Sequence, residues 1–120
     1  MAVNWSELQA REVETILATY PAASNRCEIC ATKVRAIGVA VDSGAHCLSV
    51  RPVGRERFVV PKADLQGTRW YYHFTAHVQS HCVDALTSAQ GALASSYLTT
   101  HWNYPDRLSL TVEEPADVEE

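Results

Sequence analysis

The sequence predicts an α+β fold in which N-terminal helices pack on a small antiparallel sheet. Apolar residues recur at helical spacing up to about residue 43, and beyond Gly44 the apolar period changes to two. The segment 70–78 is rich in aromatic and β-branched residues and has the strongest strand pattern in the chain. We therefore expect a helical part at about 6–43, followed by a sheet part at about 45–87.

The composition is that of one globular domain covering residues 1–120. The chain is 47% hydrophobic, enough for a core without disulfide bonds, and its net charge of −4 argues against nucleic-acid binding. No apolar run reaches the length of a membrane span, and the N-terminus lacks a signal-peptide pattern. We expect a protein that is cytoplasmic as synthesised, with reduced cysteines, no cofactor and no membrane contact. Export by a signal-peptide-independent secretion system stays compatible with this pattern.

The helical part contains two predicted helices. Ser6 and Gln9 form a capping-box pattern that starts the first helix, expected at 6–19 and ended by Pro21. Its apolar stripe comprises Leu8, Val13, Ile16, Leu17 and Tyr20. Ser24 or Asn25 can cap the second helix, which is expected to end near Asp42. Its buried stripe comprises Cys30, Val34, Ile37 and Val41.

The sheet part contains four predicted strands, at 47–53, 57–60, 70–78 and 81–86. Gln79 and Ser80 are predicted to form a two-residue hairpin turn. That loop length places Thr75 opposite Asp84, with His73 diagonal to Asp84 on the same face.

The C-terminal part, at about 89–112, is predicted to hold a helix and an edge strand. The helix is expected at 89–100, with Leu93, Tyr97 and Leu98 turned inward, and the strand at 108–112. The acidic tail 113–120 is expected to be frayed.

Cys27 is the candidate nucleophile. A thiol attacks as its thiolate, which the free N–H groups and the dipole of a helix N-terminus stabilise. Helical phase places Cys27 at the second or third position of the second helix, and Cys30 one turn further into the buried stripe. We therefore interpret Cys30 as an inert core residue. Glu28 points elsewhere on a helix and receives no role.

His73 and Asp84 are the candidate partners of this thiol. In the general logic of a catalytic triad, His73 accepts the proton and Asp84 orients the imidazole ring. The Cys27 backbone N–H and the Asn25 side chain are candidate oxyanion donors. Each residue alone is explained more simply by core packing or solvation, and His77 is a competing base. A cysteine at a helix start combined with a His–Asp hairpin pair is a demanding arrangement.

The chain resembles the small papain-like fold toxin domains of bacteria, specifically the second papain-fold toxin group. The resemblance spans about residues 21–91 and is carried by Asn25, Cys27, Cys30, Ala31, Tyr72, His73, Val83 and Asp84. It implies a papain-like core with Cys27 as nucleophile, His73 as base and Asp84 as orienter. It also implies a peptidase, deamidase or related acyl-transfer enzyme that acts on a protein substrate, and a cognate immunity protein as a further partner.

Two features depart from that family. The glutamine that papain-type enzymes place before the cysteine would fall near Pro21. The family's usual fusion to a delivery or repeat region does not occur within these 120 residues, so we expect an excised domain or a free-standing relative.

A zinc-stabilised or non-catalytic protein-binding module is the alternative. Cys27 and Cys30 have metal-ligand spacing, and His77 and His81 resemble the second half of a two-Cys, two-His site. The gap between the two halves is much longer than in a zinc finger.

Overall fold

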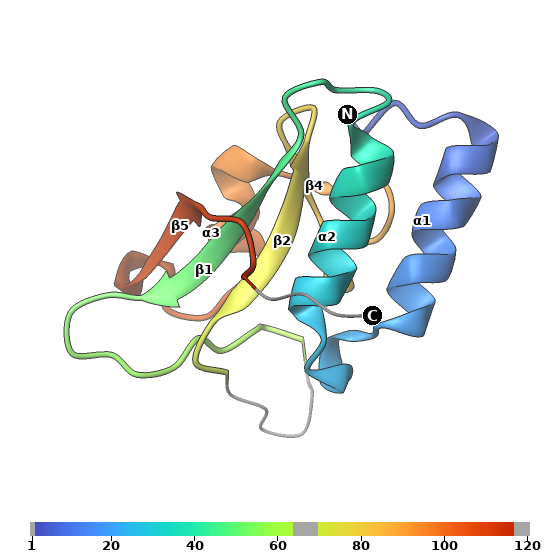
Figure 1. Cartoon of the computed structure of the whole chain (residues 1–120). Helices are drawn as coiled ribbons and strands as arrows, with labels where there is room; N and C mark the ends of the chain where they lie inside the picture. Colours follow the sequence, from blue (N-terminus) through green and yellow to red (C-terminus); the bar gives the residue numbers. More distant parts are fainter. Residues whose placement is uncertain (1, 64–69, 117–120) are drawn as a thin grey trace.

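The computed structural model describes residues 2–63 and 70–116. Within them the chain forms three α-helices and a five-stranded antiparallel sheet of order β4-β3-β2-β1-β5, which confirms the α+β class (Figure 1). The elements are α1 (Glu7–Thr19), η1 (Ala22–Ser24), α2 (Cys27–Gly38), β1 (His46–Pro52), β2 (His73–Val78), β3 (His81–Val83), β4 (Ala92–Leu93), α3 (Ala94–His101), η2 (Pro105–Arg107) and β5 (Leu108–Val112).

Helices cover both faces of the sheet. The helices α1 and α2 lie side by side against one face, and α3 lies against the other (Figure 1). The first core cluster joins α1 and α2 to the sheet through Val13, Cys30, Val34, Ala76, Val78 and Val83. The second cluster lies under α3 and contains Leu48, Val50, Val59, Cys82, Tyr97 and Trp102.

The first helix begins as predicted. Ser6 accepts a hydrogen bond from the Gln9 N–H, and the Gln9 side chain accepts one from the Ser6 N–H, so the capping box is confirmed. Val13 is fully buried, but Leu8 is 67% exposed and does not belong to the buried stripe. The two positions differ by about 140° around the helix axis, which turns Leu8 to solvent.

The second helix differs from the prediction at both ends. Its N-cap is Arg26, which no described side chain caps by a hydrogen bond. Cys27 is therefore the first residue of the helix rather than its second or third. Asn25 instead has a left-handed backbone, with φ of 59°. The helix ends at Gly38, before the predicted end, and the following segment is tied to the hairpin because Asp42 accepts a hydrogen bond from the Gln79 N–H.

The hairpin register is confirmed. Ala76 pairs with Val83 and Val78 pairs with His81, around a two-residue turn at Gln79 and Ser80. Both turn residues have positive φ, of 50° and 65°, without a glycine. Gln79 is held in this conformation by hydrogen bonds, one of which runs from its side-chain amide to the Val41 carbonyl.

Three predicted strands are shorter in the structure. The return strand stops at Val83, because Asp84 accepts a hydrogen bond from the Leu86 N–H and closes a turn. The regular part of 70–78 begins at His73. The predicted strand 57–60 contributes only an isolated bridge between Val59 and Trp70.

The C-terminal part also differs from its prediction. The helix predicted at 89–100 begins at Ala94, and Leu93 lies in β4 with 42% of its surface exposed, so its inward assignment was wrong. Tyr97 is fully buried and β5 is an edge strand, as predicted. The first residue of the predicted frayed tail is ordered, since the Glu113 carboxylate accepts two hydrogen bonds from Arg51. Residues 117–120 of that tail lie outside the described residues.

Candidate active site

Cys27 occupies the first position of α2 and is partly exposed. The Arg26 carbonyl accepts the first intrahelical hydrogen bond, from the Cys30 N–H. The N–H groups of residues 27–29 therefore have no partner inside the helix, and Cys27 lies at the positive end of the helix dipole. The Cys27 sulfur also lies 3.4 Å from Oε1 of Glu28.

His73 is the first residue of β2 and is only 3% exposed. Its ring stacks on Trp70 at a centroid distance of 5.3 Å and lies 5.3 Å from the ring of Trp102. Nε2 lies 3.3 Å from Oδ2 of Asp84, and the ring lines the same two cavities as the Cys27 thiol. Since Nε2 faces Asp84, Nδ1 is the nitrogen left for the thiol.

The surroundings favour a protonated His73. Burial alone would lower the pKa of the imidazole, but its hydrogen bond with Asp84 and its interaction with the neighbouring Cys27 thiol outweigh burial and raise that pKa to about 9. The ring is thus held as an imidazolium beside the thiol at neutral pH.

Asp84 follows β3 and is 2% exposed. Its Oδ2 accepts a 2.6 Å hydrogen bond from the Tyr97 hydroxyl, and its Oδ1 accepts one from the Leu86 N–H. Burial would raise the pKa of this carboxyl group, but hydrogen bonds from His73 and Tyr97 and the charge of His73 lower it below 3.8. Asp84 is therefore an ionised and oriented partner of His73.

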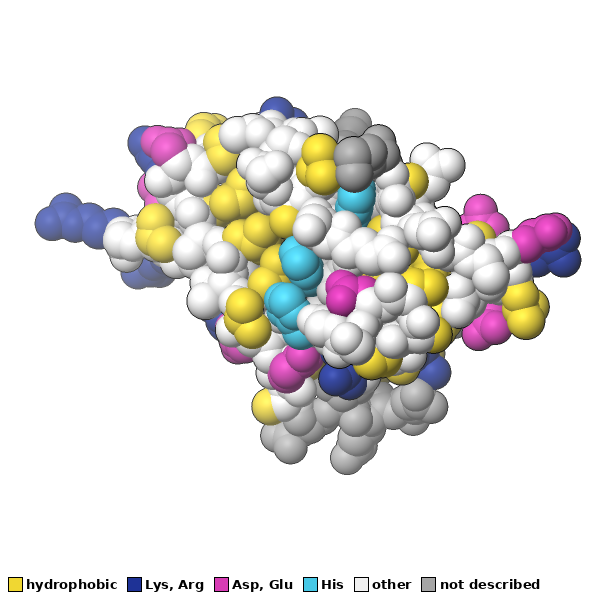
Figure 2. Space-filling view, turned by 90° about the horizontal axis from the view of Figure 1, so that it is seen from above, with side chains coloured by type: hydrophobic (Ala, Val, Ile, Leu, Met, Phe, Trp, Pro, Cys, Tyr) yellow, Lys and Arg dark blue, Asp and Glu magenta, His cyan; other side chains and the backbone are white. Residues whose placement is uncertain are grey.

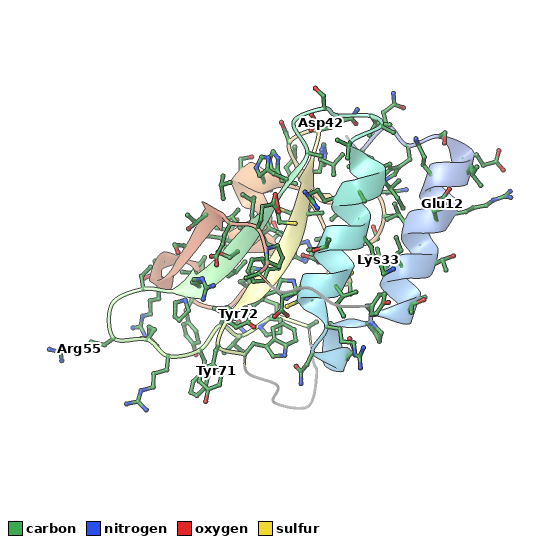
Figure 3. The ribbon with its side chains drawn as sticks, viewed as in Figure 1. Glu12, Lys33, Asp42, Arg55, Tyr71 and Tyr72 are labelled. Atoms are coloured by element: carbon green, nitrogen blue, oxygen red, sulfur yellow. The ribbon has the colours of Figure 1, made fainter. Side chains whose placement is uncertain are left out.

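A cleft of about 290 Å³ opens beside the thiol. Its lining includes Ala22, Asn25, Cys27, Glu28, Trp70, Tyr71, Tyr72 and His73. A second, smaller cavity is lined by Cys27, His73 and Asp84 together. The structure thus brings these three predicted residues together from α2, β2 and the turn after β3. In Figure 3, Tyr71 and Tyr72 mark the end of the sheet where the cleft lies, and Asp42 marks the opposite end.

Asn25, the predicted oxyanion donor, lines the cleft but is exposed. Within the described residues its side chain forms no hydrogen bond that would fix it towards the thiol. The first-turn N–H groups of α2 are therefore the better-placed donors.

The sequence interpretation missed Glu28 and Tyr72. The Tyr72 hydroxyl donates a 2.7 Å hydrogen bond to Oε2 of Glu28, whose other oxygen faces the Cys27 sulfur. The expectation that Glu28 points elsewhere was wrong, because the first helical turn splays both side chains over one cleft. No sequence spacing signals this contact, since the two residues belong to a helix and a loop far apart in the chain.

The alternative zinc ligands do not converge. Cys27 and Cys30 lie near the start of β2, whereas His77, near its far end, stacks on His46 at a centroid distance of 4.7 Å. Figure 2 views that far end and shows histidine side chains next to each other on the surface. Among the described residues, no group of three or more His, Cys, Asp or Glu side chains is arranged to hold a metal ion. Because His77 lies near the far end of β2 from Cys27, it is not placed to act as a competing base.

The remaining thiols are buried. Cys30, Cys47 and Cys82 are each at most 3% exposed, and burial raises the pKa of the first two to about 12. The pKa of Cys82 is also raised by burial. Cys27 is therefore the one partly exposed cysteine of the four.

Comparison with known proteins identifies no relative: no family model, curated protein or solved structure matches the chain. Within the described residues, every helix is too short or too polar to cross a lipid bilayer.

Proposed function

We propose that this protein is a small cysteine hydrolase or acyl-transfer enzyme with a papain-like core. Cys27 is the nucleophile, His73 the acid and base, and Asp84 the group that orients His73. The observation that carries the proposal is the buried His73 ring, which bonds to the Asp84 carboxylate and lines one cavity together with Asp84 and the Cys27 thiol.

The proposed reaction starts with attack of the Cys27 thiolate on an amide or ester carbonyl. The carbonyl oxygen gains negative charge, which the free N–H groups of the first α2 turn stabilise. Imidazolium His73 protonates the leaving amine or alcohol, and a thioester remains on Cys27. Neutral His73 then removes a proton from water or another acceptor, the thioester is cleaved, and the thiol is regenerated.

The biological setting follows from the resemblance to papain-like fold toxin domains. The substrate is a protein, the reaction is peptide cleavage or deamidation, and a cognate immunity protein blocks the cleft. The protein is made in the cytoplasm and acts as an effector after delivery to its target. The cleft beside the one partly exposed thiol supports a thiol-dependent reaction on a substrate that enters from outside.

Activity of matched cysteine variants tests the proposal. Wild type, Cys27→Ala and Cys30→Ala are compared for growth inhibition on expression and for hydrolysis of peptide and glutamine-amide substrates. We expect Cys27→Ala to lose the activity and Cys30→Ala to retain it, because Cys30 is a buried core residue. Equal activity of Cys27→Ala and wild type would reject catalysis by this thiol.

A non-catalytic protein-binding module is the second candidate. The observation in its favour is Tyr71, which is 72% exposed and packs against the Phe58 ring at 5.3 Å. This candidate requires no selectively reactive thiol, so uniformly slow alkylation of all four cysteines at neutral pH would support it.

A further inference from the structure

Glu28 gives the cleft a negative wall directly beside the nucleophile. The described lining of the cleft contains this one carboxylate and no lysine or arginine. Three consecutive aromatic residues, Trp70, Tyr71 and Tyr72, supply the rest of the large side chains. A carboxylate flanked by aromatic rings is the chemistry that attracts an organic cation.

The partners of Glu28 among the described residues are neutral donors. Oε2 accepts from the Tyr72 hydroxyl at 2.7 Å, and Oε1 accepts from the Cys27 thiol at 3.4 Å. These bonds orient the carboxylate without cancelling its charge. An ionised carboxylate has about four acceptor positions, so capacity for a further donor remains.

The arginine behind the cleft is occupied elsewhere. Arg51 forms two hydrogen bonds with the Glu113 carboxylate, at 2.9 and 2.7 Å. Its guanidinium lies 5.0 Å from the centre of the Tyr72 ring. Arg51 therefore supports the Tyr72 ring from the β1 side, while Glu113 balances its charge.

The positive charge of His73 is also balanced. The ring is buried and paired with ionised Asp84, so the imidazolium and the carboxylate together contribute little net charge to the cleft. Glu28 is left as the uncompensated charge among the described lining residues.

From this arrangement we infer that the cleft selects substrates with a cationic side chain, of lysine or arginine type, next to the reacting carbonyl. The inference rests on the proposed function and names its substrate class. The substrate cation approaches Glu28 and lies against the aromatic rings. It also offsets the repulsion between the Glu28 carboxylate and a thiolate on Cys27, so a cationic substrate strengthens the nucleophile that attacks it.

Charged thiol reagents test this inference without requiring turnover. Aminoethyl methanethiosulfonate is cationic, and sulfonatoethyl methanethiosulfonate is anionic and of similar size. Each transfers its thioalkyl group to the Cys27 sulfur as a disulfide and releases methanesulfinate. Rates are followed by intact mass and assigned to Cys27 by peptide mapping, at low ionic strength. The same two rates are measured for a small neutral thiol in solution, to correct for the intrinsic reactivities of the reagents. The cationic-to-anionic rate ratio of the protein is then divided by the ratio for that thiol.

We expect this normalised ratio to be about tenfold or more in the wild type, because a unit charge lies within a few ångströms of the sulfur. Glu28→Gln should reduce the ratio to within about twofold of unity. Glu12→Gln removes the same charge from the exposed face of α1 and should leave the ratio unchanged (Figure 3). Tyr72→Phe keeps the ring and the carboxylate and should retain the preference. A wild-type ratio near unity, or equal ratios in wild type and Glu28→Gln, would overturn the inference.

The outcome is separable from that of the proposed function. A lost charge preference with retained hydrolysis rejects only the cationic subsite. A clear charge preference in a protein without hydrolytic activity rejects only catalysis.

Discussion

The Tyr97 hydroxyl donates a 2.6 Å hydrogen bond to Oδ2 of Asp84, the same oxygen that faces Nε2 of His73. Tyr97 lies on α3 and is fully buried, whereas Cys27 lies on α2 across the sheet. The candidate site is therefore supported from both faces of the sheet. Helix α2 brings the nucleophile, and α3 fixes the carboxylate that orients the base.

Tyr97→Phe should destabilise the protein by about 1–3 kcal/mol, because a buried carboxylate loses a hydrogen-bond donor while the ring packing is retained. Denaturant unfolding at neutral pH measures this change. Tyr104→Phe is the matched control, since Tyr104 is 63% exposed and should shift the unfolding free energy by less than about 0.5 kcal/mol. Equal effects of the two variants would show that the Tyr97–Asp84 bond contributes nothing to stability.

Gly91→Ala should destabilise the protein more than Gly54→Ala. Both glycines have positive φ, of 82° and 67°, so alanine is strained at either position. A Cβ at Gly91 would also lie 2.9 Å from Cβ of His81, whereas no described residue has an atom within 4 Å of a Cβ at Gly54. Thermal unfolding of the two variants gives the difference. The steric account is wrong if Gly54→Ala is the less stable protein.

The sequence was sufficient for the features that depend on local pattern. The capping box at Ser6 and the parity of the hairpin were both readable, and this parity correctly placed His73 diagonal to Asp84. The apolar periodicity predicted these features because each apolar face packs against a continuous layer.

The sequence was insufficient where contacts join distant segments. The Glu28–Tyr72 hydrogen bond and the Tyr97–Asp84 hydrogen bond follow from how α2 and α3 dock on the sheet, which no spacing encodes. The boundaries of the second helix also depended on tertiary contacts, since Asp42 bonds to the hairpin turn instead of extending α2.

Treatment with a metal chelator should leave the thermal stability of the protein unchanged. The pairs Cys27–Cys30 and His77–His81 do not converge on a common point, so no zinc site closes between α2 and the hairpin. Dialysis against a strong chelator should leave the melting temperature unaltered, and elemental analysis should find no stoichiometric zinc. A chelator-induced loss of several degrees, reversed by zinc, would restore the metal-stabilised alternative.

Stability should fall as the pH rises from 6.5 towards 9. Burial lowers the pKa of His73, but the hydrogen bond to Asp84 and the interaction with the Cys27 thiol raise it to about 9, above the ordinary value of 6.5. In that window the folded state binds more protons than the unfolded state, so the unfolding free energy decreases with pH. The contribution is complete below pH 6.5 and is lost as the pH passes through about 9. One such group gives a slope of at most about 1.4 kcal/mol per pH unit.

Denaturant unfolding between pH 6.5 and 8 measures this slope over a range in which cysteines exposed by unfolding stay mostly protonated. His73→Gln should remove the slope, and the matched control His101→Gln should retain it, because that substitution leaves the His73–Asp84 pair intact. His77 does not supply the slope, because burial lowers its pKa. Titration of His77 makes the unfolding free energy rise with pH, and this effect is confined to pH values below 6.5. A wild-type stability that is flat or rises between pH 6.5 and 8 contradicts a protonated His73 in the folded protein. In that case the resting site would hold a neutral imidazole beside a thiol, and the thiolate would have to form as the substrate binds.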